Sequence, residues 1–303
     1  MATTFVLPVD GPFSLAAAAS FGFGPNPGRS RPADDVLRLA FVSDDLGSHV
    51  GAVIRQQDDG SLAVQAEIRG QAGLDVVAAQ LARILSVDAP VQGWLAAGQA
   101  DPVLGRIQAE HPGLRPVLFH SPYEAAAWSV LSQRRHRAQA IALRRRLSDA
   151  MGATFTLAGQ AEPAFPLPSE LIRIKEFPGI DGERMTRLRG VALAACDGRL
   201  DATSLRHMPA DAAMAGLQQI RGLGPVYSML VYLRSTGVTD ALASGEPRLA
   251  GYLQHYYGLP STPDAQGMRQ LAEPWRPFRT WACVLFRVAG DRDGLAEHGF
   301  SRR

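Results

Sequence analysis

Residues 218–229, QQIRGLGPVYSM, decide the fold, because they combine the end of one helix, a glycine turn and the start of a second helix. Gly222 and Gly224 lack a Cβ, so consecutive backbone N–H groups can point outward from the turn. Pro225 suits the first position of the second helix, where its missing N–H costs nothing. The positive end of that helix dipole points at the same turn, which makes the turn a candidate phosphate-binding site. An ordinary tight turn between two helices is the alternative.

Composition sets the class of protein. The chain has 303 residues, 46% of them hydrophobic, which is enough for two domains of ordinary size. It has no apolar run of about 18 residues and no secretory signal at its start, so we expect no membrane span. Cys196 and Cys283 lie far apart and are too few for a cysteine-ligated zinc or iron–sulfur site. We expect a monomeric, bacterial-type cytoplasmic protein with no metal and no other cofactor.

The charge is unevenly distributed along the chain. Residues 1–120 hold 8 arginines against 12 carboxylates, whereas the rest holds 22 arginines and Lys175 against 17 carboxylates. The basic part, with a net charge of +6, is the part that carries the glycine turn. This balance suits contact with nucleic acid. Because Lys175 is the only lysine, an amine nucleophile would have to be Lys175 or the N-terminus.

Residues 1–115 are predicted to form an α+β N-terminal domain in which helices accompany an antiparallel sheet. Apolar runs and period-two alternation predict strands at 5–9, 36–42, 50–55 and 62–68, with a hairpin turn at 56–60. Helical spacing predicts a helix at 74–85, and glycines and prolines predict a loop at 22–35. No group of polar residues in this domain points to a particular chemistry.

Residues 116–303 are predicted to form an all-α domain of six to eight helices around a cleft. Ser121 and Glu124 flank Pro122 in a capping-box pattern, and the helix that follows is expected to continue through Leu147. Prolines interrupt the chain near residue 166. Further helices are expected around residues 227–236, 248–257 and 268–288.

The order of these motifs resembles the helix-hairpin-helix DNA glycosylases, specifically a divergent member of the 3-methyladenine DNA glycosylase II type. The resemblance covers nearly the whole chain. It rests on LSQ at 131–133, FPLP at 165–168, IRGLGP at 220–225 and AEPWRPFR at 272–279. The last segment is similar to the family signature Ala-Glu-x-Trp-x-Pro-Trp/Phe-Arg. The resemblance implies an α+β domain followed by a helix-hairpin-helix glycosylase-type domain.

The resemblance also implies chemistry. Enzymes of this type flip a damaged base out of double-stranded DNA and release it. The family's catalytic Asp, which stabilises the oxocarbenium-like sugar, falls on Glu246. Glutamate supplies the same charge but reaches one methylene further, and a misplacement of about 1 Å can cost about 100-fold in rate. A solvated loop carboxylate without a catalytic role is the alternative.

Further roles follow from the same resemblance. The turn residues Gly222, Leu223, Gly224 and Val226 would hold the DNA backbone. The duplex probe would be formed by Gln133 and Arg134, the latter at the place of an aliphatic wedge. A possible base pocket, whose members could equally be core residues, consists of Trp128, Tyr227, Leu230, Trp281 and Arg287. The lysine of bifunctional members falls on Val226, so we expect a monofunctional enzyme that uses water.

An arginine-rich segment follows the probe. Its members either contact phosphates or form a solvated helix face: Arg134, Arg135, Arg137, Arg144, Arg145 and Arg146. Three functions stay open. The first is a monofunctional glycosylase for alkylated purines, and the second is a catalytically inactive DNA-binding paralogue that keeps the scaffold. The third is a partner-binding domain without DNA contact.

Overall fold

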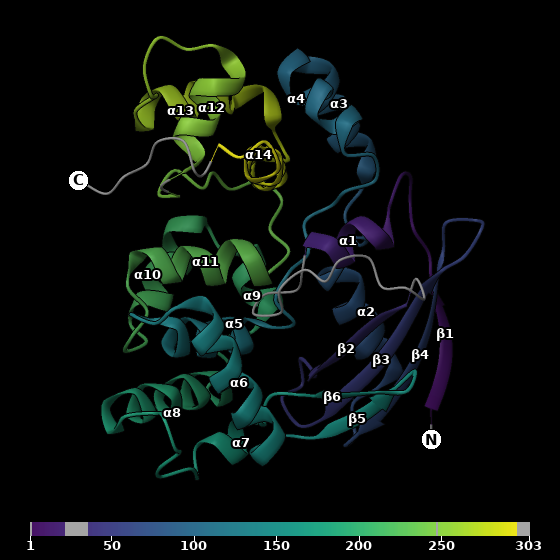
Figure 1. The fold of residues 1–303 in the computed structure, drawn as a ribbon, viewed down its shortest axis with the longest axis vertical. Coiled ribbons are helices and arrows are strands. Elements are labelled where there is room, and N and C mark those ends of the chain that lie inside the picture. Colours follow the sequence, from purple (N-terminus) through teal and green to yellow (C-terminus); the bar gives the residue numbers. More distant parts are fainter. Residues whose placement is uncertain (1, 22–35, 247, 296–303) are drawn as a thin grey trace.

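A computed structural model describes residues 2–21, 36–246 and 248–295, so the loop expected at 22–35 lies outside the described residues. Figure 1 shows a β-sheet on one side and a block of helices, α5 to α11, beside it. A second group of helices, α12 to α14, forms a layer at one end together with α3 and α4. In the described part of the chain, no helix is both long and apolar enough to cross a bilayer.

The sheet is antiparallel with the strand order β1-β4-β3-β2, and its strands confirm the four predicted ones. Their bounds are β1 Ala2–Leu7, β2 Leu37–Val42, β3 His49–Gln56 and β4 Leu62–Arg69. Leu39, Phe41, Ile54 and Val64 are fully buried in a core shared with the predicted helix α2, Leu74–Ile84. Helix α1, Leu15–Phe21, packs on the same core.

A hairpin that was not predicted covers the other face of the sheet. It consists of β5 (Thr154–Leu157) and β6 (Gln160–Pro163), and Phe155 on β5 is fully buried. A Cβ on Gly51 of β3 would come within 2.5 Å of the Phe155 ring, so glycine at this position lets the hairpin lie flat on the sheet. The turn residues Ala158 and Gly159 both have positive φ, as a tight two-residue hairpin requires.

Sequence order and spatial grouping differ at the other end of the molecule. Helices α3 (Val91–Ala100) and α4 (Pro102–Glu110) precede residue 116 but contact α14 (Arg279–Arg292) and the short 3₁₀ helix η1 (Glu273–Trp275). Trp94 of α3 packs edge-to-face against Trp281 with ring centroids 5.7 Å apart. Asp101 caps α4 and also accepts a hydrogen bond of 2.8 Å from Trp275 Nε1. The first third of the chain therefore supports the helical end layer.

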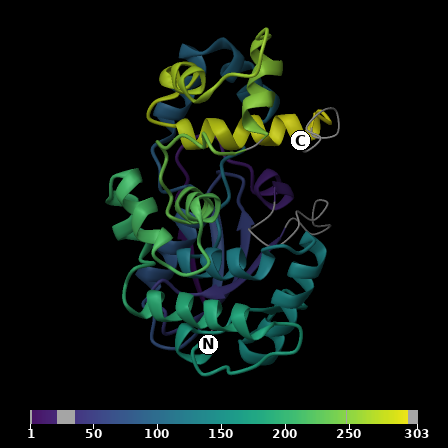
Figure 2. The same ribbon diagram turned by 90° about the vertical axis from the view of Figure 1, so that its left-hand side faces the viewer.

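The helical part contains ten α-helices among the described residues, more than the six to eight expected. Figure 2 shows these helices from the side opposite the sheet. Their bounds are α5 Pro122–Ser132, α6 Arg137–Met151, α7 Pro168–Leu171, α8 Gly182–Cys196, α9 Ala202–His207, α10 Ala210–Gln218, α11 Pro225–Ser235, α12 Leu249–Tyr257, α13 Ala265–Leu271 and α14 as given above.

Two predicted helices are each interrupted. The helix expected to run from Ser121 through Leu147 ends at Ser132, and Arg134 has a positive φ of 53° in the turn before α6. The helix expected at 268–288 is divided into α13, η1 and α14. Pro274 and Pro277 explain the second break, because proline cannot donate the backbone hydrogen bond that continues a helix.

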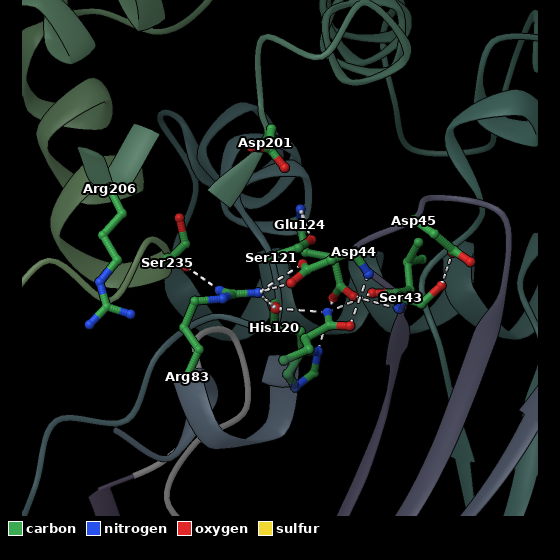
Figure 3. Close-up of polar contacts among 12 residues, drawn as sticks. Ser43, Asp44, Asp45, Arg83, His120, Ser121, Glu124, Asp201, Arg206 and Ser235 are labelled. Carbon is green, nitrogen blue, oxygen red and sulfur yellow. Dashed lines mark hydrogen bonds and ion pairs between the residues drawn. The ribbon is translucent and has the colours of Figure 1, made fainter. Parts of the chain in front are cut away.

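A buried polar network joins the sheet to the helices (Figure 3). Ser121 caps α5 as predicted by accepting a hydrogen bond of 3.2 Å from Glu124 N. The Glu124 carboxylate, however, does not return to Ser121: it accepts hydrogen bonds from Val42 N at 3.0 Å and from Arg144 at 2.7 Å. It also contacts His120 Nδ1 at 3.1 Å. The end of β2 is thus fixed to α5 and α6.

Arg83 extends this network to the C-terminal end of α11. Its guanidinium pairs with Asp44 at 2.7 Å, donates to the carbonyl of His120 at 3.1 Å and also donates to the carbonyl of Ser235. Ser235 is the last residue of α11, the helix that begins at the glycine turn. Helix α2 therefore fixes one end of α11, and the other end lies at the surface.

Candidate functional site

The glycine turn joins α10 to α11 as predicted. Gly222 has a φ of 102°, a conformation that L-residues with a side chain rarely adopt, so glycine is required there. Pro225 is the first residue of α11, also as predicted. Gly224 has an ordinary extended backbone, and a Cβ placed on it would meet no described atom within 4 Å. Folding therefore does not require glycine at residue 224. The absence of a side chain there leaves open space for a ligand.

Most of the turn amides stay available. The N–H of Leu223 donates to the carbonyl of Ile220 at 2.9 Å. The N–H groups of Gly222, Gly224 and Val226 make no hydrogen bond to any residue that the structure describes. They stand at the positive end of the α11 dipole, where such groups attract anions. The Val226 side chain is 59% exposed beside them.

The predicted probe lies next to this turn. Gln133 donates from Nε2 to the carbonyl of Gly222, which links the α5–α6 turn directly to the glycine turn. The two turns border a surface hollow of about 530 Å³. Its lining contains Gln133, Arg134, Arg187, Gln218, Ile220, Arg221, Gly222, Leu223, Gly224 and Tyr227. The structure thus brings together the residues expected at the DNA backbone and at the duplex probe, apart from Val226.

Two arginines of α8 complete this arrangement and were missed by the sequence interpretation. Arg187 donates to Gln133 Oε1 at 3.3 Å, and Arg184 donates to the Gln133 carbonyl at 3.0 Å. The Arg187 side chain also packs close to Gly222, since a Cβ built on this glycine would lie 3.1 Å from it. The signal was present in the sequence, because Arg184, Arg187 and Arg189 lie close together in the segment between Gly182 and Gly198.

The arginine-rich segment after the probe divides into different roles. Arg144 is buried and pairs with Glu124 at 2.7 Å, so neither phosphate contact nor a solvated face describes it. Arg135 and Arg146 donate to the carbonyls of Gly179 and Pro178, at 2.8 and 3.2 Å. Arg134 and Arg137 are exposed, and of these two Arg134 lines the hollow.

Glu246 lies at the N-terminus of α12. Its Oε2 accepts hydrogen bonds from the backbone N–H groups of Arg248 at 2.9 Å and Leu249 at 2.6 Å. Its Oε1 accepts a hydrogen bond from Arg287, and its side chain is 24% exposed. Glu246 is therefore an oriented carboxylate whose hydrogen bonds stabilise the start of α12.

The loop that carries Glu246 contacts the helix that starts at the glycine turn. A Cβ on Gly245 would stand 3.6 Å from the Met229 side chain, and Met229 lies one turn into α11. The loop before the carboxylate thus lies beside the helix whose N-terminus carries the open turn amides. Arg83 fixes the far end of α11. This helix therefore connects the glycine turn, the loop that carries Glu246 and the buried polar network.

The predicted pocket residues occupy different environments. Tyr227 lines the hollow beside the turn. Trp128 and Leu230 are half-buried on α5 and α11, which pack against each other. Trp281 is 3% exposed and packs edge-to-face against Phe278 and Trp94, so it belongs to the hydrophobic core of the end layer. Arg287 faces Glu246.

No family model and no curated protein matches this chain. Solved structures do. A 3-methyladenine DNA glycosylase from Archaeoglobus fulgidus aligns over 95% of this chain and 98% of its own, with a TM-score of 0.72 and 15% identity. An 8-oxoguanine glycosylase/lyase from Clostridium acetobutylicum, solved with double-stranded DNA, covers 85% of this chain and 88% of its own, with a TM-score of 0.60 and 15% identity.

A DNA-3-methyladenine glycosidase from Bacillus halodurans gives a TM-score of 0.52 at 21% identity, over 70% of this chain and 93% of its own. At these identities the likeness concerns the fold. This chain has the fold of these DNA glycosylases, so the fold that the sequence resemblance implies is confirmed.

Proposed function

We propose that this chain is a monofunctional DNA N-glycosylase of base excision repair, which binds damaged double-stranded DNA and hydrolytically releases alkylated purines. The observation that carries this proposal is the place of Glu246, an oriented carboxylate on a loop that packs against the helix of the glycine turn. As proposed, the protein acts as a monomer in the bacterial cytoplasm and is associated with the nucleoid when it is bound to DNA.

The turn supplies the DNA anchor in this proposal. The amides of Gly222, Gly224 and Val226 bind a backbone phosphate, and the open space at Gly224 lets the phosphate approach closely. Arg134 and Arg187 border the same hollow and add positive charge. Such contacts give affinity that does not depend on base sequence. Gln133 and Arg134 then enter the duplex where the flipped nucleotide leaves the stack.

The carboxylate supplies the chemistry. When the glycosidic bond breaks, positive charge develops on the sugar, and the Glu246 carboxylate stabilises it while water adds to C1′. Two backbone N–H groups and Arg287 fix the carboxylate direction before the substrate arrives. In this proposal the extra methylene of glutamate is accommodated because the side chain folds back onto the first turn of α12.

The absence of lyase activity rests on the lysine distribution. Val226 stands where bifunctional members carry their Schiff-base lysine. The only lysine of the chain, Lys175, is exposed in the segment between α7 and α8. A water molecule is therefore the proposed nucleophile.

A second candidate function is DNA binding without base release. It is favoured by the ion pair between Arg287 and Glu246, because a guanidinium on the carboxylate offsets the charge that the sugar needs. In this case the protein binds DNA, but the site no longer hydrolyses the glycosidic bond.

The two candidates are separated with purified protein and duplexes that carry alkylated purines. Single-turnover release of free base is measured together with DNA affinity. Glu246→Gln is expected to lower release about 100-fold or more while affinity is retained, because the amide still accepts the capping hydrogen bonds. Glu273→Gln is the matched control, since Glu273 is 65% exposed and pairs with Arg276 at the surface.

Binding by the unmodified protein without release of any tested base would support the second candidate. A protein with no salt-sensitive DNA affinity would contradict both candidates and favour a partner-binding domain.

A further inference from the structure

Arg287 is held between two carboxylates at the candidate catalytic centre. Its Nη1 donates to Glu246, and its Nη2 donates to Asp291 Oδ2 at 3.1 Å. Its guanidinium carbon lies 5.6 Å from the centroid of the Tyr252 ring. The side chain is 20% exposed, so the charge is partly shielded from water but is still accessible from the surface.

Asp291 keeps this guanidinium in place independently of Glu246. Asp291 Oδ1 accepts hydrogen bonds from Tyr252 Oη at 2.6 Å and from Arg248 at 3.3 Å. Gly290 makes this arrangement possible, because a Cβ there would come within 2.4 Å of the Tyr252 ring. Asp291 therefore holds Arg287 beside the Glu246 carboxylate rather than letting the guanidinium move into solvent.

The charge of the leaving base decides what this guanidinium does. The bond between C1′ and the base nitrogen breaks with both electrons passing to the base, and the water oxygen then bonds to C1′ while its proton goes to solvent. A cationic alkylpurine leaves as a neutral molecule. An uncharged alkylpurine leaves as an anion, which takes a proton from water after it departs.

Arg287 thus acts in opposite directions on the two kinds of substrate. A guanidinium beside the bond repels a base that is already cationic. The same guanidinium stabilises negative charge that develops on an uncharged base, as donors do in an oxyanion hole. Glu246 and Arg287 would then act on the two fragments of the broken bond, the carboxylate on the sugar and the guanidinium on the base.

We propose that Arg287 is a specificity-determining residue and that it directs this site to uncharged alkylated purines, such as ethenoadenine, in preference to cationic ones, such as 7-methylguanine. The inference rests on the proposed function, since it assigns the substrate class of the same site. The anion-stabilising donor is Arg287, and Asp291 is its positioning residue.

The test compares two duplexes that are identical except for one ethenoadenine or one 7-methylguanine. Single-turnover rates of base release are measured with excess full-length protein. The unmodified protein is expected to release ethenoadenine faster. Arg287→Gln is expected to lower ethenoadenine release about 100-fold and to raise 7-methylguanine release, because one donor is lost and the repulsion disappears. Arg287→Lys, which keeps the charge, is expected to retain the direction of the preference.

The control variant is Arg292→Gln, five residues further along the chain at the end of α14. It removes the same charge but pairs with Glu110 and Asp293 and does not touch Glu246. It is expected to leave the ratio of the two rates unchanged. Thermal unfolding and DNA affinity of every variant verify that it is folded and binds.

The opposite effects on the two lesions distinguish the proposal from simple damage to the protein. Equal loss of both rates in Arg287→Gln, or faster release of 7-methylguanine by the unmodified protein, would overturn the specificity role and leave the proposed function standing. Release of neither base by the unmodified protein, with DNA binding intact, would overturn the proposed function itself.

Discussion

Replacing Glu124 by glutamine removes the charge at the centre of the network between the sheet, α5 and α6. Burial by itself would raise the pKa of Glu124, but attraction to His120 and Arg144 and the hydrogen bonds from His120 and Val42 lower it from 4.5 to about 2. This difference corresponds to about 3 kcal/mol of folding free energy. Because the folded pKa lies below the unfolded one, that contribution is complete above about pH 4.5 and is lost as the pH falls toward 2.

The assay is urea unfolding followed by tryptophan fluorescence at a series of pH values. At pH 7 Glu124→Gln is expected to unfold with about 3 to 5 kcal/mol less free energy, since Arg144 stays buried without its counter-charge. Below pH 4 the difference from the unmodified protein should narrow. Glu67→Gln is the control, because its exposed pair with Arg69 is worth less than about 1 kcal/mol. Equal stability at pH 7, or a gap that does not change with pH, would refute this reasoning.

Two glycine substitutions test the site. Gly224→Asp is expected to lower DNA affinity about 10-fold or more, because its carboxylate repels the phosphate. The slope of log affinity against log salt concentration should fall by about one unit. The control Ala212→Asp adds the same charge on the exposed face of α10 and should change both quantities less. Unchanged binding would exclude the anchor role. Gly290→Ala is expected to destabilise the fold by about 1 to 3 kcal/mol and to slow base release, because its Cβ overlaps Tyr252. The helical Gly216→Ala, which meets nothing within 4 Å, should not destabilise, and equal unfolding midpoints for the two alanine variants would contradict the packing argument.

Local features of the fold could be read from the sequence where local physics determines them. The four strands follow from alternation and β-branched residues, and Pro225 marks the first residue of α11. The Ser121 cap is correct for the same reason. In each case the deciding interaction lies within a few residues of the signal.

Contacts between distant segments could not be predicted in this way. Arg144 lies in an arginine-rich helix. Its burial is explained only by its ion pair with Glu124 on a neighbouring helix. The β5–β6 hairpin is too short to produce a clear periodic pattern. The partner of Glu246 was also hidden, because Arg287 lies 41 residues away on another helix.

The two halves of the chain support each other's structure. The β5–β6 hairpin covers the N-terminal sheet, while α3 and α4 return the contact by holding α14. Cutting the polypeptide at residue 115 would separate Trp94 from Trp281 and expose both aromatic rings to water. Recombination between relatives of this protein should therefore tolerate exchanged surface loops far better than exchanged halves, because each half carries part of the other's interior.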